Sequence, residues 1–190
     1  MKLAILGGSF NPVHLGHLSL AEEVRARLAL DHILFIPSNI PAHKEPDTRT
    51  GTRHRFKMLE LAASTVPWIL LDDCEIKRGG VSYSIETVED CKKRYKIEGK
   101  PGLIIGDDLV EGFSTWKRVQ ALYSESQIII VHRKYEERLD VNFPHVYIDN
   151  CRLCISSRDI RERVKMGRPF RFLVPEAVYS YIISNGLYKD

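Results

Sequence analysis

The chain has 190 residues, of which 44% are hydrophobic and 28% charged, a composition typical of a globular protein. Its 28 lysines and arginines against 25 aspartates and glutamates leave a net charge of +3, which is too balanced to favour a nucleic-acid or membrane partner. No apolar run approaches membrane-spanning length and the start lacks a signal-peptide pattern, so we expect a cytoplasmic protein.

Short apolar runs alternate with helical patterns along the chain. The apolar runs predict strands over residues 3–6, 32–36, 68–72, 102–106, 127–132 and 146–149. The periodic patterns predict helices over residues 16–29, 55–64, 84–95, parts of 108–123, 157–166 and 175–185. The strands are apolar throughout, which suits a parallel sheet buried on both faces. We therefore expect one α/β domain over residues 1–190, with a doubly wound parallel sheet, helices on both faces and a small C-terminal helical extension.

The first predicted strand runs into "GGSFNPVHLGH" at residues 7–17. A junction of this kind is the usual phosphate site of a parallel sheet. His14 and His17 are three residues apart, so they share one face of a helix that starts near them, and Gly16 leaves room for a nucleotide. Two imidazoles there can donate hydrogen bonds to phosphate oxygens. As zinc ligands they would lack an identified third partner, and as ordinary turn residues they would do no chemistry.

The segment "ISSRDIRERV" at residues 155–164 again places serines before a helix. Ser156 and Asp159 fit a capping box, which would explain the serine structurally. We expect Arg161 in the first turn, where the helix dipole disfavours a cation unless an anion is bound. Two such helix starts in one small α/β domain favour phosphate binding.

Two further segments leave their roles open. The loop 37–52 has three prolines and the basic residues Lys44 and Arg49, with Arg53 directly after it, which suits either a lid or a static connector. Cys151 and Cys154 form one isolated CxxC, too few ligands for a zinc site, and Cys154 lies in "RLCIS", which we interpret as a strand with buried thiols.

The two phosphate motifs resemble the signatures of the HxGH nucleotidyltransferase superfamily, and within it the bacterial nicotinate-nucleotide adenylyltransferases. Stretches such as "SYSIET" (82–87) and "LIIGDDLVEGFSTWKRV" (103–119) resemble that branch in the family's order. The resemblance implies a Rossmann-like domain that joins ATP to nicotinate mononucleotide, giving deamido-NAD and pyrophosphate. It implies Mg²⁺ brought with ATP and no metal held by the protein alone.

The resemblance also implies the site residues, position by position. His14, His17 and Arg161 would be catalytic, and Trp116 would stack on the pyridine ring. The implied ATP site consists of Gly7, Gly8, Ser9, Phe10, His14, His17, Lys44, Ser156 and Arg161. The implied mononucleotide site consists of Lys44, Tyr83, Ser84, Asp108, Trp116 and Arg133.

Several alternatives stay open from the sequence alone. The acceptor could be phosphopantetheine or a small phosphorylated alcohol, although "SYSIET" and Trp116 suit an aromatic ring better. A sensor that binds ATP without turnover and an interaction module with incidental histidines belong to other functional classes. The residues do not decide between nicotinate and nicotinamide mononucleotide as the acceptor. They also leave the oligomeric state open, and a homo-oligomer is among the alternatives.

Overall fold

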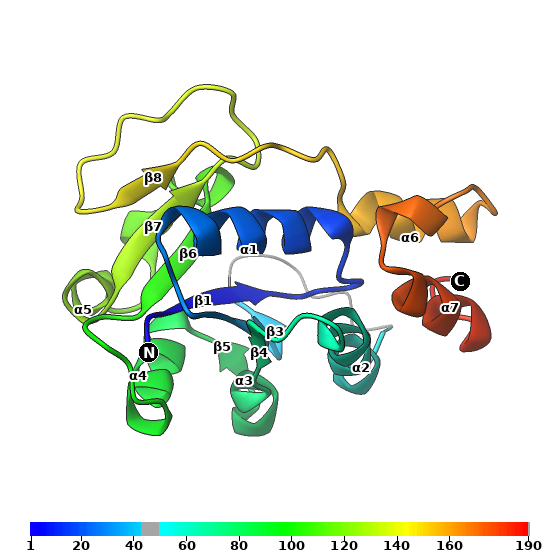
Figure 1. Cartoon of the computed structure of the whole chain (residues 1–190), viewed down its shortest axis with the longest axis horizontal. Helices are drawn as coiled ribbons and strands as arrows, with labels where there is room; N and C mark the ends of the chain where they lie inside the picture. The colour runs from blue at the N-terminus through cyan, green and yellow to red at the C-terminus, as the bar shows by residue number, and fades with distance from the viewer. Residues whose placement is uncertain (43–49, 190) are drawn as a thin grey trace.

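The computed structural model describes residues 1–42 and 50–189, and its centre is a six-stranded sheet (Figure 1). Every neighbouring pair of strands is parallel, as predicted. The strand order is β4 (Ile69–Leu71), β2 (His32–Pro37), β1 (Leu3–Gly8), β6 (Gly102–Gly106), β7 (Gln127–Val131) and β8 (Val146–Ile148). The chain winds outward in both directions from β1 and β6. Ligands of such folds bind at the carboxyl ends of the strands beside this switch point.

Helices cover both faces of the sheet, because successive strand residues point to opposite sides. Ala4 and Leu6 of β1 face one core, whereas Leu3 and Ile5 face the other. The first core is closed by α1 (Leu15–Arg27), α2 (Thr52–Ala63), α6 (Ser157–Lys165) and α7 (Glu176–Ser184). The second is closed by α3 (Cys74–Arg78), α4 (Ser84–Arg94) and α5 (Val119–Glu125). This arrangement confirms the predicted doubly wound α/β fold.

The helices α6 and α7 lie beyond the carboxyl end of β1, where α1 begins (Figure 1). The predicted C-terminal helices are therefore packed at the end of the sheet where a ligand is expected. Ile160 of α6 and Val178 and Ile182 of α7 are fully buried in the first core. In residues 1–42 and 50–189, no helix combines the length and apolarity needed to cross a bilayer.

The structure corrects the prediction for "RLCIS". Residues 151–156 form no strand: the backbone N–H of Cys151 donates to the carboxylate of Glu23 at 2.9 Å, and that of Ile155 donates to Leu153 within a tight turn at 2.7 Å. Because one of these N–H groups bonds to a side chain and the other within a turn, neither takes part in a ladder with β8. Cys151 and Cys154 are exposed rather than buried.

Smaller elements also differ from the expectations. The segment 108–123 contains two short 3₁₀ helices, η1 (Asp107–Leu109) and η2 (Phe113–Thr115), before α5. A third, η3 (Arg171–Leu173), precedes α7. The sequence did not predict α3, nor the two-stranded sheet formed by β3 (Ile40–Pro41) and β5 (Val81–Ser82). These elements are too short to show a clear hydrophobic period.

Candidate functional site

The two histidines of the first motif lie together at the start of α1. His14 is the N-cap residue, and its backbone N–H donates to Nδ1 of His17 at 3.2 Å. The two ring centroids are 3.7 Å apart. Because Nδ1 of His17 accepts a hydrogen bond, a neutral His17 carries its proton on Nε2, where it can donate to a ligand.

His14 is buried and electrically neutral at pH 7. Burial, followed by the nearby charge of Arg133, lowers the pKa of His14 from 6.5 to about 4. Its Nδ1 is buried without a hydrogen-bond partner in the described part of the chain. A buried polar atom of this kind normally has a partner, so its position next to a helix start favours a ligand there.

Gly16 makes room for the ring of His14. A Cβ at position 16 would lie 3.1 Å from both Cε1 and Nδ1 of that ring, closer than ordinary contacts. The absence of a side chain at Gly16 therefore first leaves room for the ring of His14, a group of this chain, rather than for a ligand. The first turn of α1 also holds no acidic side chain, so the positive end of its dipole is not neutralised by one.

Residues 9–13, here called the nucleotide loop, are held by groups from the far end of the chain. Arg161 donates through Nη1 to the carbonyl oxygen of Asn11 at 2.8 Å. The hydroxyl of Ser157 donates to the carbonyl of Pro12 at 2.8 Å, and the hydroxyl of Tyr188 donates to Oδ1 of Asn11 at 2.8 Å. The fold thus brings the two predicted motifs into direct contact.

The start of α6 differs in two details from the expectation. Ser156 is the N-cap, and its Oγ accepts the backbone N–H of Asp159 at 3.0 Å, which confirms its capping role. Arg161 is the fifth helical residue and therefore lies just beyond the first turn. Its guanidinium reaches the nucleotide loop because the side chain is long, so the helix dipole alone does not explain its position.

Arg55 is a site residue that sequence reasoning missed. It is 5% exposed, and its Nη1 donates to the carbonyl of Ser9 at 2.9 Å. Burial lowers the pKa of its guanidinium. The sequence contains a signal for this position. Arg55 lies three and four residues before the buried residues Met58 and Leu59, so it falls on the inward face of α2.

The glycines and Phe10 shape the approach to the histidines. A Cβ at Gly7 would meet open space, whereas one at Gly8 would lie 3.2 Å from the ring of Phe10. Phe10 is 2% exposed, and its ring makes an edge contact with that of His17 at 5.0 Å. Phe10 therefore supports His17 from the core. Lys44 lies outside the described residues.

The residues predicted for the mononucleotide gather at the ends of β6 and β7 and at the start of α4. Tyr83 is the N-cap of α4 and Ser84 its first residue. The ammonium of Lys117 lies 4.1 Å from the centre of the Tyr83 ring. Trp116 is 9% exposed and packs on Phe113 with ring centroids 4.7 Å apart, so most of its surface belongs to the second core.

Asp108 and Arg133 form an ion pair with 3.4 Å between Oδ1 and Nη1. They come from neighbouring parallel strands, because Asp108 follows β6 and Arg133 follows β7. The effect of Arg133 on His14 shows that this cation lies within electrostatic reach of the histidine pair. Because β1, β6 and β7 are parallel neighbours, Asp108, Arg133 and the nucleotide loop that follows β1 lie at the same edge of the sheet.

Within residues 1–42 and 50–189, no three His, Cys, Asp or Glu side chains are grouped so as to hold a metal ion. The donors near the histidines are imidazoles, guanidiniums and hydroxyls, which suit phosphate rather than a hard cation. A magnesium ion at this site would take its oxygen ligands from a bound triphosphate and from water.

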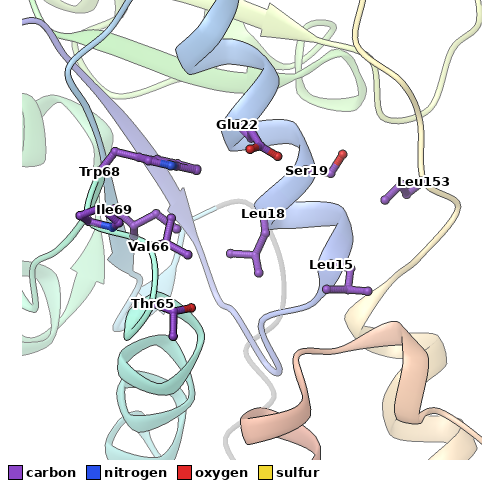
Figure 2. Close-up of a pocket in the computed structure, with 10 residues that line it drawn as sticks. Leu15, Leu18, Ser19, Glu22, Thr65, Val66, Trp68, Ile69 and Leu153 are labelled. Carbon is purple, nitrogen blue, oxygen red and sulfur yellow. The ribbon is translucent and has the colours of Figure 1, made fainter.

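An apolar groove of about 460 Å³ lies on the outer side of α1 (Figure 2). Leu15, Leu18 and Glu22 of α1 line one wall, and Val66 and Trp68 line the other. None of the predicted site residues lines this groove. We therefore define the candidate site by the polar groups around the nucleotide loop and the two histidines, and not by the apolar groove beside α1.

Comparison with known proteins agrees with this geometry. Residues 5–163 match the family model described as Cytidylyltransferase-like. A probable nicotinate-nucleotide adenylyltransferase of Borreliella burgdorferi is 44% identical over 188 residues, which cover 99% of this chain and 97% of that protein. The probable nicotinate-nucleotide adenylyltransferase of Treponema pallidum is 36% identical over 204 residues, covering 100% of both chains.

The fold has a counterpart among solved structures. The nicotinic acid mononucleotide adenylyltransferase of Plasmodium falciparum complexed with NaAD superposes with a TM-score of 0.79 at 18% identity. The superposition covers 98% of this chain and 97% of that one. At this level of identity the comparison establishes a shared Rossmann-like fold.

Proposed function

This chain belongs to the cytidylyltransferase-like family, and from that membership and its full-length relatives we propose that it joins ATP and nicotinate mononucleotide. The products are deamido-NAD and pyrophosphate, so the enzyme serves NAD biosynthesis. The observation that supports the proposal most directly is the hydrogen bond from Arg161 to the carbonyl oxygen of Asn11, which ties the second motif to the loop that leads into the histidine pair. The four cysteines are free, which suits work in the reducing cytoplasm where ATP is used.

The reaction is a direct in-line transfer. An oxygen of the mononucleotide phosphate forms a bond to the α-phosphorus of ATP, and the bond from that phosphorus to the β-bridging oxygen breaks as pyrophosphate leaves. A phosphate monoester has a second pKa near ~6, so the attacking oxygen is already mostly ionised at neutral pH and needs no general base. The work left to the protein is positioning and stabilisation of charge.

His14 and His17 bind the triphosphate at the start of α1. His17 donates from Nε2, because its Nδ1 is occupied by the backbone of His14. Arg161 and Ser156 hold the part that leaves as pyrophosphate, with Arg161 beside the nucleotide loop. A Mg²⁺ ion brought with ATP would be held mainly by the phosphates and water and would neutralise part of the triphosphate charge. Lys44, assigned to both substrates by its sequence motif, is part of the proposal from the sequence alone.

The second nucleotide occupies the edge lined by residues from α4, β6 and β7. Trp116 stacks on the pyridine ring, and Tyr83 and Ser84 lie at the start of α4. Asp108 and Arg133 meet the ribose phosphate, and the charge of Arg133 extends toward His14. In-line attack requires the acceptor phosphate to approach the α-phosphorus from the side opposite the leaving pyrophosphate, and we assign Arg133 to hold it there.

The test is pyrophosphate release from Mg-ATP with nicotinate mononucleotide, nicotinamide mononucleotide or phosphopantetheine as the acceptor. We expect the nicotinate form to be used fastest. His17→Ala should lower turnover by roughly 10²-fold, as for the loss of one preorganised donor. His145→Ala, which changes an exposed histidine beyond the site, is the matched control. Turnover with phosphopantetheine alone, or full activity in His17→Ala, would refute the assignment.

A further inference from the structure

Asp107 is a buried carboxylate with an unusual set of partners. It follows β6 directly and is 1% exposed. Its Oδ1 accepts the backbone N–H groups of Arg133 at 3.0 Å and Lys134 at 2.8 Å, and its Oδ2 accepts that of Tyr135 at 3.1 Å. Hydrogen bonds to an ionised acceptor are roughly twice as strong as neutral ones. One side chain therefore fixes three consecutive residues that follow β7.

Arg133 is confined from a second side by Gly106. A Cβ at position 106 would lie 2.4 Å from Cδ of Arg133 and 2.2 Å from Oδ1 of Asp108. The aliphatic part of Arg133 therefore crosses the bare backbone of Gly106, and its guanidinium ends at Asp108. The backbone of Arg133 is set by Asp107 and the direction of its side chain by Gly106.

This double constraint matters because the side chain of Arg133 is 53% exposed. Exposed arginines have several rotatable bonds, and holding one in a single direction costs side-chain entropy. A residue that is already confined loses less entropy when a ligand binds, so the ligand binds more tightly. The guanidinium ends at Asp108, at the carboxyl edge of the sheet, where β1 also ends and the nucleotide loop begins.

We propose that Asp107 is a positioning residue, which holds the 133–135 segment so that Arg133 meets the phosphate of the acceptor nucleotide. Asp107 touches no substrate and acts through Arg133. The inference rests on the proposed function, because it takes the acceptor to be nicotinate mononucleotide. It predicts that disturbing Asp107 weakens acceptor binding selectively and leaves ATP binding intact.

The experiment measures dissociation constants by titration calorimetry, with nicotinate mononucleotide and with a non-hydrolysable ATP analogue. In Asp107→Asn the amide can still accept from Arg133 and Lys134, but its NH₂ group faces the N–H of Tyr135, donor against donor. We expect the Kd for the mononucleotide to rise about tenfold, which corresponds to about 1.4 kcal/mol, and the Kd for the ATP analogue to stay within about twofold.

A double-mutant cycle separates positioning from a general loss of structure. In the Arg133→Gln background, Asp107→Asn should weaken mononucleotide binding less than about twofold further, because the group it positions is gone. An undiminished tenfold effect in that background would overturn the inference, as would equal weakening of both ligands in the single variant.

Gly106→Ala provides an independent variant should Asp107→Asn fail to fold. The added methyl group displaces Arg133 without altering the buried carboxylate, and Gly106 has φ of −73°, which alanine adopts freely. The same selective loss is expected. Gly112→Ala, where a Cβ meets open space, is the matched control. A wild-type protein that fails to bind nicotinate mononucleotide would instead refute the proposed function, and the inference with it.

Discussion

Replacing Gly16 by alanine should lower activity while leaving the fold as stable as before. The added Cβ would lie 3.1 Å from two atoms of the His14 ring, whereas carbon atoms pack best at about 3.5–4.0 Å. The ring must therefore shift by about 0.4–0.9 Å. It is buried and stacked on His17, so the shift is passed to the second histidine.

The two effects of Gly16→Ala can be estimated separately. A misplacement of about 1 Å in a catalytic constellation can cost about 100-fold in rate, so we expect kcat/KM for ATP to fall about 10–100-fold. Alanine in place of glycine stabilises a helix by up to about 1 kcal/mol, and the φ of Gly16 is not positive, so alanine adopts its backbone without strain. The expected change in Tm is therefore within about 4 °C of zero.

Steady-state pyrophosphate release and calorimetric unfolding of Gly16→Ala, beside the control Gly112→Ala, measure both quantities. Activity equal to that of the wild-type protein would refute the view that the position of the His14 ring matters. A Tm lowered by ten degrees or more would show that the substitution damages the fold rather than the ring.

Three further predictions follow from the same geometry. The pKa of His14 is about 4 in the folded protein and 6.5 in the unfolded chain, so the unfolded chain binds the proton more tightly. As the pH falls from 7 to 4, the wild-type protein should therefore lose roughly 3 kcal/mol of unfolding free energy. Urea titrations should show a smaller loss in His14→Gln. Tyr188→Phe removes one hydrogen bond to Asn11, worth about 1 kcal/mol, and should lower kcat several-fold with an unchanged circular dichroism spectrum. Arg55→Gln should raise the KM for ATP about tenfold, and an equal rise in the exposed Arg53→Gln would contradict the role given to Arg55.

The sequence predicted those parts of the structure that depend on short-range patterns. All six strands of the central sheet were expected, since a buried parallel strand is an unbroken apolar run. His14 and His17 were placed together because three residues bring side chains onto one helix face. Both features depend on a few consecutive residues, so one sequence is enough to reveal them.

The missed features depend on contacts between distant segments. Asp107 acts on residues 26 to 28 positions further along the chain, and nothing in "GDD" identifies which of its two carboxylates turns inward. The run "RLCIS" has the apolar character of a strand, but the sheet ends at β8 and gives it no partner. Cys154 is exposed for the same reason. The hydrophobic character of a segment predicts its tendency to form a strand, but the strand forms only where the edge of a sheet is close enough to pair with it.

The anchoring of the nucleotide loop has a consequence for how the protein is made. Asn11 leaves the ribosome early, but Tyr188, whose hydroxyl donates to Asn11, follows 177 residues later. At about 5–20 residues per second, the delay is about 9–35 s. For most of that time the nascent chain contains both histidines and much of the sheet, but its nucleotide loop is not yet fixed in the arrangement that binds ATP. The chain therefore becomes catalytically active only after α6 and α7 have been synthesised, and an incomplete nascent chain has no activity.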